Sequence, residues 1–407
     1  MDYSPVIKLG IVIVLIVLGL RRKLPLGLVM VGAALLLGFL FQVAAGTVVM
    51  TLLGTVVDSL TLELVGILTL VMILEKVLQD QGVMEEMVAG VRRSIKNPRL
   101  AVTLLPTLIG LLPSAGGALF SCPLVDQVAE EMELSPEVKS YINYWFRHIW
   151  EYSFPLYPAI ILTAGVVGMG VTELIPYLLP FTLIALLVGV LFLRSIAGDK
   201  LGRQLEATPV QWQDLLGICK GLAPILVTVL LVIVFKMPVV LSLALAVGGL
   251  LLYRRYNWAG LAGIIRRLDY RILLSVVGIM MFKEMLITSG MPAVLPEIML
   301  GLNLPPLLIV AAVPFLLGML MGLSSGFIGV GFPLLMSLLG GTMDPAYIIV
   351  AYVSGLTGIM VSPMHLCMLL TIGYFRSRFG PFWRWVALSQ GVMVGFAFLF
   401  FWLIPRV

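Results

Sequence analysis

The chain has 407 residues, of which 60% are hydrophobic and only 12% are Asp, Glu, Lys or Arg. A soluble domain carries about 25% charged residues, so this composition excludes a soluble enzyme, a disordered or fibrous protein and a disulfide-rich secreted domain. The formal net charge is +5, but the basic residues recur between apolar segments and form no single stripe, so we expect no nucleic-acid partner. The sequence predicts an all-α polytopic membrane protein, with the lipid bilayer as its solvent.

Ten apolar segments are long enough to cross a hydrocarbon core of about 30 Å at about 1.5 Å per residue. In chain order we expect these spans at about 5–20, 24–42, 60–80, 141–170, 175–195, 213–235, 238–253, 272–290, 346–373 and 385–404. Basic residues 21–23 follow the first span without a small-residue cleavage site, so we expect this span to be retained. Cys122, Cys219 and Cys367 lie in apolar contexts, and we expect them to be small buried hydrophobic residues.

Two further apolar regions, at about 100–134 and 305–343, are interrupted midway by small residues at 113–117 and 322–326. Each region is either a broken span or a re-entrant helical hairpin, and the positive-inside rule distinguishes the two. With two hairpins, 20 of the 26 Lys and Arg residues fall on the cytoplasmic side and three outside; with two single crossings the split is 11 against 12. We therefore expect two re-entrant hairpins, and both chain termini on the outer side of the cytoplasmic membrane.

The two halves of the chain repeat at an offset of about 208 residues, which pairs Gly82 with Gly290 and Pro155 with Pro363. Each copy contains five predicted spans, an odd number, so the second copy is inserted upside down relative to the first. The predicted division is a first repeat at 1–200, a cytoplasmic linker at 201–212 and a second repeat at 213–407. An inverted-topology repeat with interrupted helices is typical of secondary transporters.

Four breaks interrupt the predicted helices, at the hairpin tips 113–117 and 322–326 and at the proline-containing segments 153–158 and 361–365. Non-helical backbone within a membrane survives only where protein or a water-filled cavity covers it. Hairpin tips present helix N-termini, which suit a carboxylate or phosphate, and unwound carbonyl groups suit Na⁺. The alternative is an ordinary kink packed against small residues, but two symmetric pairs of breaks favour a binding site.

The breaks supply the candidate site residues. For substrate binding these are Ser114, Ala115, Gly116, Gly117, Ser324, Ser325, Gly326, Tyr157 and His365. For the coupling ion they are Ser153, Pro155, Ser362 and Pro363. Serine hydroxyls supply hydrogen bonds, glycines let a ligand approach the backbone, and each proline frees a carbonyl group in the preceding turn. The alternative for His365 is a hydrogen-bonded core histidine. We expect no cofactor and no resident metal ion.

Charged residues also occur within the predicted spans, where they are costly and often functional. Lys283 and Glu284 match Glu75-Lys76 of the first repeat, and Lys283 is a candidate to attract an anion. The alternatives are a structural ion pair and a proton relay. Arg147 and Glu151, spaced i, i+4 before the first proline break, are interpreted as a structural ion pair.

A competing motif, G-x-S-x-G, is present at 322–326, upstream of His365. A serine–histidine pair in a membrane would indicate an intramembrane hydrolase. The nucleophile elbow of soluble hydrolases requires a strand before the serine, and none is expected here. The repeat also accounts for Ser324 without catalysis, because Ser114 occupies the matching position and Tyr157 stands where His365 would be.

The segments LLPSAGGALFSCPLVDQV, FPLYPAI, GLSSGFIGVGFPLL and VSPMHLC resemble the ion transporter superfamily, which includes dicarboxylate/citrate symporters, gluconate permeases and arsenite permeases. Within it, the chain is most similar to a prokaryotic integral-membrane family of unestablished substrate. The resemblance covers nearly the whole chain and implies a homodimer in which hairpins and broken helices form a transport domain that moves against a scaffold. The dicarboxylate symporters carry Ser-Asn-Thr at each tip, where this chain has Ser-Ala-Gly at 114–116 and Ser-Ser-Gly at 324–326.

These observations predict a secondary active transporter of a small organic anion, a carboxylate or sugar acid, coupled to Na⁺ or H⁺. The resemblance implies an elevator-type mechanism in the cytoplasmic membrane. The alternatives are a passive channel or facilitator for a small polar solute and an intramembrane serine hydrolase.

Overall fold

A computed structural model of the chain describes residues 4–22, 24–82, 90, 97–111, 117–197, 212–291 and 305–404. These residues form helices and connecting turns, without a strand among them. In an apolar surrounding, a helix satisfies its backbone hydrogen bonds within one segment, which explains the choice of this element. The fold is therefore all-helical, as predicted.

The first half of the chain contains nine α-helices and one short 3₁₀ helix within the described ranges. They are α1 (Ser4–Arg21), α2 (Leu26–Leu40), α3 (Ala45–Val57), α4 (Ser59–Asp80), α6 (Pro98–Gly110), α7 (Gly117–Glu131), α8 (Pro136–His148), the 3₁₀ helix η1 (Ile149–Tyr152), α9 (Pro158–Val167) and α10 (Val171–Ala197).

The second half follows the same order over its described residues. Its helices are α11 (Trp212–Ile233), α12 (Val239–Tyr253), α13 (Trp258–Arg266), α14 (Tyr270–Thr288), α16 (Pro306–Met321), α17 (Ser324–Leu338), α18 (Pro345–Val361), α19 (Leu366–Phe375) and α20 (Phe379–Leu403). Each of these helices begins 207–213 residues after its counterpart in the first half.

Backbone conformation repeats with the helices. Gly82 and Gly290, which are 208 residues apart, both have positive φ angles, at 61° and 78°. Gly168 and Arg376, at the same offset, end α9 and α19 in the left-handed conformation. The structure thus has the same element order in both halves, while the opposite membrane orientation of the two copies, the hairpins as re-entrant elements and the division at 201–212 stay predictions.

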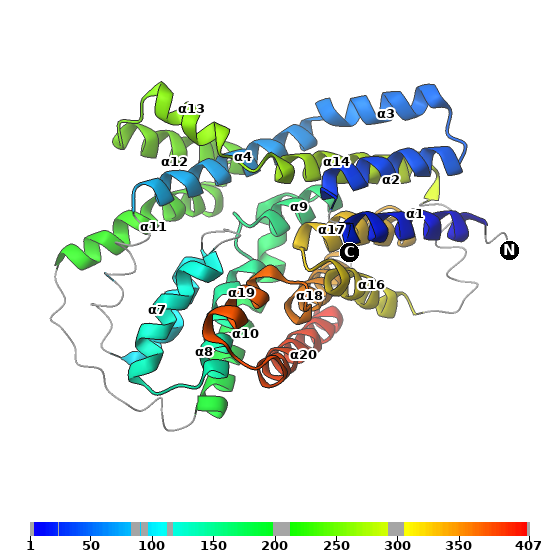
Figure 1. Ribbon diagram of the computed structural model, residues 1–407. Helices are drawn as coiled ribbons and strands as arrows, with labels where there is room; N and C mark the ends of the chain where they lie inside the picture. The colour runs from blue at the N-terminus through cyan, green and yellow to red at the C-terminus, as the bar shows by residue number, and fades with distance from the viewer. Residues whose placement is uncertain are drawn as a thin grey trace.

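The helices form two layers (Figure 1). The upper layer consists of α2–α4 and α12–α14, in which α2 packs against α14 and α12 packs against α4. Helix α1 packs against α2, and α11 packs against α12. The lower layer consists of α6–α10, η1 and α16–α20, in which α6 packs against α8, α16 against α18 and α17 against α9. The layers meet where α17 contacts α14 and α9 contacts α4.

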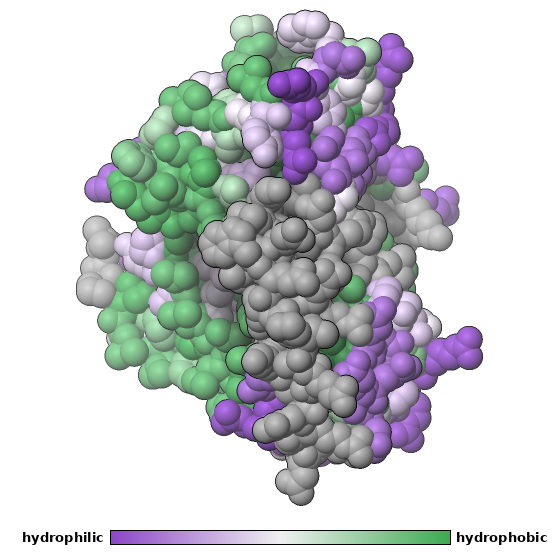
Figure 2. All heavy atoms as spheres, turned by 90° about the vertical axis from the view of Figure 1, so that its left-hand side faces the viewer, coloured by the Kyte–Doolittle hydropathy of each residue, from purple (hydrophilic) through white to green (hydrophobic). Residues whose placement is uncertain are grey.

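The outer surface is largely apolar. Phe39, Leu252 and Trp258 are 79%, 81% and 87% exposed. Figure 2 shows hydrophobic side chains over much of the left side of the view and hydrophilic ones mainly at the right. Exposed apolar surface of this extent suits a lipid surrounding and not water. The chain is a multi-pass membrane protein.

The number of membrane spans is a separate question. By length and composition, three helices of the described residues could each cross a membrane: α10, the α18–α19 segment over 345–375, and α20. A fourth is possible if α3 and α4, which meet at a bend of 44°, count as one span. Other apolar helices of the described residues have only 10–17 residues, and those next to the hairpin tips and the first proline break are short because the breaks divide them. The ten predicted spans therefore stay a prediction.

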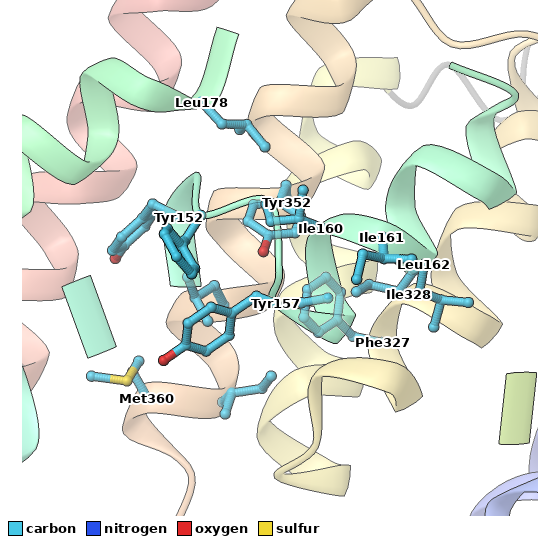
Figure 3. Close-up of a cluster of buried hydrophobic side chains, with 14 of the residues drawn as sticks. Tyr152, Tyr157, Ile160, Ile161, Leu162, Leu178, Phe327, Ile328, Tyr352 and Met360 are labelled. Atoms are coloured by element: carbon cyan, nitrogen blue, oxygen red, sulfur yellow. The ribbon is translucent and has the colours of Figure 1, made fainter. Parts of the chain in front are cut away.

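The core of the lower layer is built around the first helix break (Figure 3). Tyr157 and Tyr352 lie among aliphatic residues of α9 and α17 there, and Phe327 of α17 packs edge-on against Tyr352 with ring centroids 6.1 Å apart. The Tyr352 hydroxyl donates a hydrogen bond of 2.6 Å to the carbonyl of Glu151. The core therefore fixes the position of the break.

Glycines let α16 and α18 approach closely. A Cβ at Gly358 would collide with the carbonyl oxygen of Phe315, whereas a Cβ at Gly395 of α20 meets nothing within 4 Å. We predict that Gly358→Ala lowers the free energy of unfolding by about 1–3 kcal/mol, because the helices must separate. Thermal unfolding of the purified protein in lipid would measure this, with Gly395→Ala as the control. Equal melting temperatures for the two variants would contradict the packing described.

Candidate functional site

A cavity of about 590 Å³ lies between the two layers, a volume within the usual range for small-molecule sites. Its upper wall comes from α2, α4 and α14 and the residues before them, with Leu24, Pro25, Leu26, Leu68, Asp269, Arg271, Ile272, Ser275, Val276 and Ile279. Its lower wall consists of Arg147, Glu151, Tyr157, Pro158, Ala159, Leu162, Met321, Leu323, Ser324, Ser325 and Cys367. Both repeats contribute to each wall.

Three helices begin at this cavity. Residues 157–159 at the start of α9, residues 323–325 at the start of α17 and Cys367 in the first turn of α19 all line it. Neither Tyr157 nor Leu323 caps its helix with a side-chain hydrogen bond. The amide groups of a first helical turn have no partner within their own helix, and the positive ends of three helix dipoles lie at this surface. The surface is therefore suitable for an anion.

Four charged residues line the same space. Arg147 is 3% exposed and lies deep in the cavity, whereas Asp269 and Arg271 are exposed where α14 begins. Glu151 follows Arg147 by four residues but belongs to η1, and its Oε1 lies 3.8 Å from Nε2 of His148. The cavity thus extends from a buried arginine to an exposed arginine and aspartate at its rim.

The tip of the second hairpin supplies two of the predicted substrate residues. Ser324 and Ser325 both line the cavity. Gly326 lies one residue further along α17, where a Cβ would meet the side chain of Met321. The left-handed residue at this tip is Gly322, with φ of 63°.

The first hairpin tip cannot be compared in the same way. Ser114, Ala115 and Gly116 lie outside the described residues, and Gly117 is described only as the first residue of α7. Their assignment to the substrate site stays a prediction.

The predicted ion-site residues of the first break face the protein. Ser153 is 3% exposed, and its hydroxyl shares a hydrogen bond of 2.6 Å with the hydroxyl of Thr182 on α10. Pro155 is also buried. The carbonyl of Ile149 accepts a hydrogen bond of 3.2 Å from Thr182. This break therefore has protein partners for its polar groups, and neither Ser153 nor Pro155 lines the cavity.

The second break has a similar arrangement. Ser362 is fully buried and donates a hydrogen bond of 2.6 Å to the carbonyl of Met319, while accepting one of 3.1 Å from the amide of Met364. Pro363 is exposed. Ser362 therefore joins the break to the end of α16, and its role in ion binding stays a prediction.

Tyr157 and His365 occupy matching positions but have different partners. The Tyr157 hydroxyl donates to the carbonyl of Gly110 at the end of α6, while the residue itself lines the cavity. His365 is 9% exposed and lies behind Cys367, with Nδ1 3.0 Å from the carbonyl of Gly322 and Nε2 3.2 Å from Nε2 of His148.

The arrangement around His365 bears on the hydrolase alternative. Both of its ring nitrogens already face other groups, Gly322 and His148. No hydrogen bond joins Ser324 to His365 among the residues that the structure describes. The structure of the hairpin tip therefore explains the G-x-S-x-G pattern without catalysis. Gly322 is the C-cap of α16, and Ser324 is the first residue of α17.

Lys283 and Glu284 lie elsewhere. Their charged atoms form an ion pair of 3.8 Å on α14, beside a small pocket lined by Pro333 and Met336 of α17. Neither side chain lines the cavity between the layers. Their role in attracting an anion stays a prediction, and their position outside the cavity does not support it.

Several residues at the site were not selected from the sequence: Cys367, Asp269 and Arg271 line the cavity, and His148 lies behind it. Arg147 and Glu151 were interpreted only as a structural pair. The guanidinium of Arg147 donates from Nη1 to Sγ of Cys367, at 3.4 Å. Of the cysteines, Cys122 and Cys367 are buried, as expected, but Cys219 is exposed. Cys219 lies on α11, where an exposed face can contact lipid. In the sequence, the position of Arg147 and His148 directly before a helix break was the signal that could have identified them as residues at the site.

The chain belongs to the family described as "Protein of unknown function (DUF401)", whose pattern it matches over residues 4–404. No curated protein matches the sequence. Among solved structures, it is similar to the YdaH transporter of Alcanivorax borkumensis, with a TM-score of 0.69 and 14% sequence identity, over 93% of this chain and 99% of the other. At this identity the likeness shows a shared fold. Membership of the ion transporter superfamily stays a prediction.

The hairpin tip yields a test of the site geometry. Any other residue at position 322 would have to adopt the left-handed conformation of Gly322. Its Cβ would also lie 2.9 Å from the backbone of Met364. We expect Gly322→Ala to lower the free energy of unfolding by about 1–3 kcal/mol, because the strain falls on backbone that cannot move aside. Gly326→Ala should cost less, since only the flexible Met321 side chain must shift. Denaturant titration of both variants measures the difference, and a larger cost at Gly326 would refute this geometry.

Proposed function

We propose that this DUF401 protein is a secondary active transporter of a small organic anion, a carboxylate or sugar acid, coupled to Na⁺ or H⁺. The observation that carries the proposal is the cavity between the layers, where three helix N-termini meet Arg147 and Arg271. The helix N-termini and the two arginines favour an anion over a neutral solute, and Glu151 and Asp269 line the same cavity. The apolar walls from α2, α4 and α14 suit the carbon skeleton of an organic anion.

The two-layer architecture supports an elevator-type mechanism. In the present arrangement α9 and α17 contact the upper layer, while their repeat counterparts α19 and α7 pack against each other and against α8. An inverted repeat can exchange the roles of its copies. The exchanged state would place α7 against α4 and α19 against α14, and would open the site to the opposite side of the membrane.

The likeness to a protein named as a transporter supports the same role. The proposed membrane orientation, with both termini outside and the first turns of α2 and α14 toward the cytoplasm, follows from the distribution of Lys and Arg. Because the rim of the cavity lies at the beginning of α14, the present state would then be open to the cytoplasm. A homodimer in the cytoplasmic membrane completes the proposal.

The first functional test is ligand binding. A thermal-shift panel of carboxylates and sugar acids, run with and without Na⁺ and at several pH values, should find an anion that stabilises the protein. For that anion, Ser324→Ala should weaken binding about two- to tenfold, and Arg147→Gln about 10- to 150-fold, because a hydrogen bond to a charged group contributes more.

Lys283→Gln is the matched control, because Lys283 lies outside the cavity. It should leave the affinity unchanged. Stabilisation by neutral solutes alone would favour the facilitator alternative. Complete loss of function in Ser324→Ala together with wild-type binding in Arg147→Gln would reopen the hydrolase alternative.

The second functional test is topology. A cysteine at the exposed residue Glu133, after α7, should react with a membrane-impermeant maleimide from the cytoplasmic side, and one at Asp344, before α18, from the outside. Vesicles of both orientations in a chain without its three native cysteines would measure this. Labelling of both positions from the same side would exclude the inverted repeat.

A further inference from the structure

Three buried side chains from the two halves of the chain meet behind the cavity. His148 ends α8, His365 directly precedes α19, and Cys367 lies in the first turn of α19. They are 2%, 9% and 8% exposed. One ring nitrogen of each histidine and Sγ of Cys367 all lie within 4.8 Å of one another. This cluster joins α8 to α19, but the anion site described above does not require it.

The hydrogen bonds of the two imidazoles determine where their protons lie. Nδ1 of His148 faces the carbonyl of Tyr144, and Nδ1 of His365 lies 3.0 Å from the carbonyl of Gly322. A carbonyl oxygen only accepts hydrogen bonds, so each Nδ1 carries a proton and donates it. Each neutral ring therefore presents a lone pair at Nε2. The two Nε2 atoms face each other at 3.2 Å, an arrangement that favours a cation between them.

The distance of 3.2 Å between the two Nε2 atoms matches two ligands of one metal ion. Two nitrogen ligands at about 2.0–2.1 Å from a tetrahedral Zn²⁺ lie about 3.3 Å apart. Histidine Nδ1–H groups that donate to backbone carbonyls are the usual support of a metal-bound Nε2. The Tyr144 ring packs against both imidazoles, with centroids 4.6 Å from His148 and 5.8 Å from His365, and so holds their orientation.

The surrounding charges fit a thiolate and a cation. Arg147 donates to Sγ of Cys367 and stabilises the thiolate. Its own positive charge opposes a neighbouring cation, but Glu151 supplies a carboxylate 3.8 Å from Nε2 of His148. Cys367 and Glu151 both line the cavity, so an ion can reach the cluster from there.

We infer that His148, His365 and Cys367 bind one Zn²⁺ ion, with the fourth position directed toward the cavity. Two imidazoles and one thiolate form a donor set suited to Zn²⁺ and unsuited to Ca²⁺ or Mg²⁺. The site adjoins the cavity through Cys367, which lines it, and would hold α8 and α19 together at the second helix break. The inference does not depend on which anion is transported.

The test uses the full-length protein in detergent, freed of metal with a chelator and then titrated with Co²⁺. One Co²⁺ should bind per chain and give a sulfur-to-cobalt charge-transfer absorption, which Zn²⁺ should abolish by displacement. Cys367→Ser should lose this absorption, while Cys122→Ser and Cys219→Ser, matched controls at cysteines outside the cluster, should retain it. His148→Ala and His365→Ala should each weaken binding by at least about tenfold.

A second measurement avoids substitutions within the cluster. In a chain that retains only Cys367, Zn²⁺ should slow alkylation of its thiol by a small maleimide, and the chelator should restore the rate. Binding of less than one ion per chain, no sulfur-to-cobalt absorption or an alkylation rate unaffected by Zn²⁺ would overturn the inference. A proton shared between the two imidazoles would then be the cation that joins them.

Discussion

Backbone polar groups have no water to pair with inside a membrane, and the structure depends on how its helix breaks meet this constraint. Each of the three breaks that the structure describes is supported by side chains from other segments of the chain. Tyr352 donates to the carbonyl of Glu151 just before the first break, and Trp383 donates a hydrogen bond of 2.9 Å to the carbonyl of Val361 at the second. At the hairpin tip the carbonyl of Gly322 faces an imidazole. Because these carbonyls have protein partners, the helix N-termini after the breaks are held in place with their amide groups toward the cavity.

The arrangement of charge follows from this support. The lower layer contributes the helix N-termini and the buried Arg147, while the upper layer contributes apolar walls and an exposed rim with Arg271. A ligand between the layers would contact both, so movement of one layer along the other would change its access. The proposed Zn²⁺ ion has a structural role that is separate from transport. It would stabilise the second break within the lower layer and would not join the two layers.

Much of this fold could be predicted from the sequence, because helix breaks depend on local residues and the repeat is visible as matching residues at a nearly constant offset. Proline and glycine marked the interruptions, and the offset that pairs Gly82 with Gly290 also relates positive-φ residues of the two halves. The site was harder to predict. The i, i+4 spacing of Arg147 and Glu151 indicated a pair on one helix, but α8 ends at His148 and a 3₁₀ helix follows. The contact of His148 with His365 spans 217 residues and depends on the packing of α8 against α19, which no local pattern records.

The central claim is that the two layers move relative to each other, and a cross-link between them tests it most directly. A Cβ at Gly329 of α17 would contact the side chain of Ile279 on α14. A chain with Gly329→Cys and Ile279→Cys should therefore form a disulfide across the interface on oxidation. Uptake into proteoliposomes of the anion found by the binding panel should stop on oxidation and return on reduction, while oxidation should not change the uptake rate of the Ile279→Cys single variant. Undiminished uptake by the fully cross-linked chain would contradict the account.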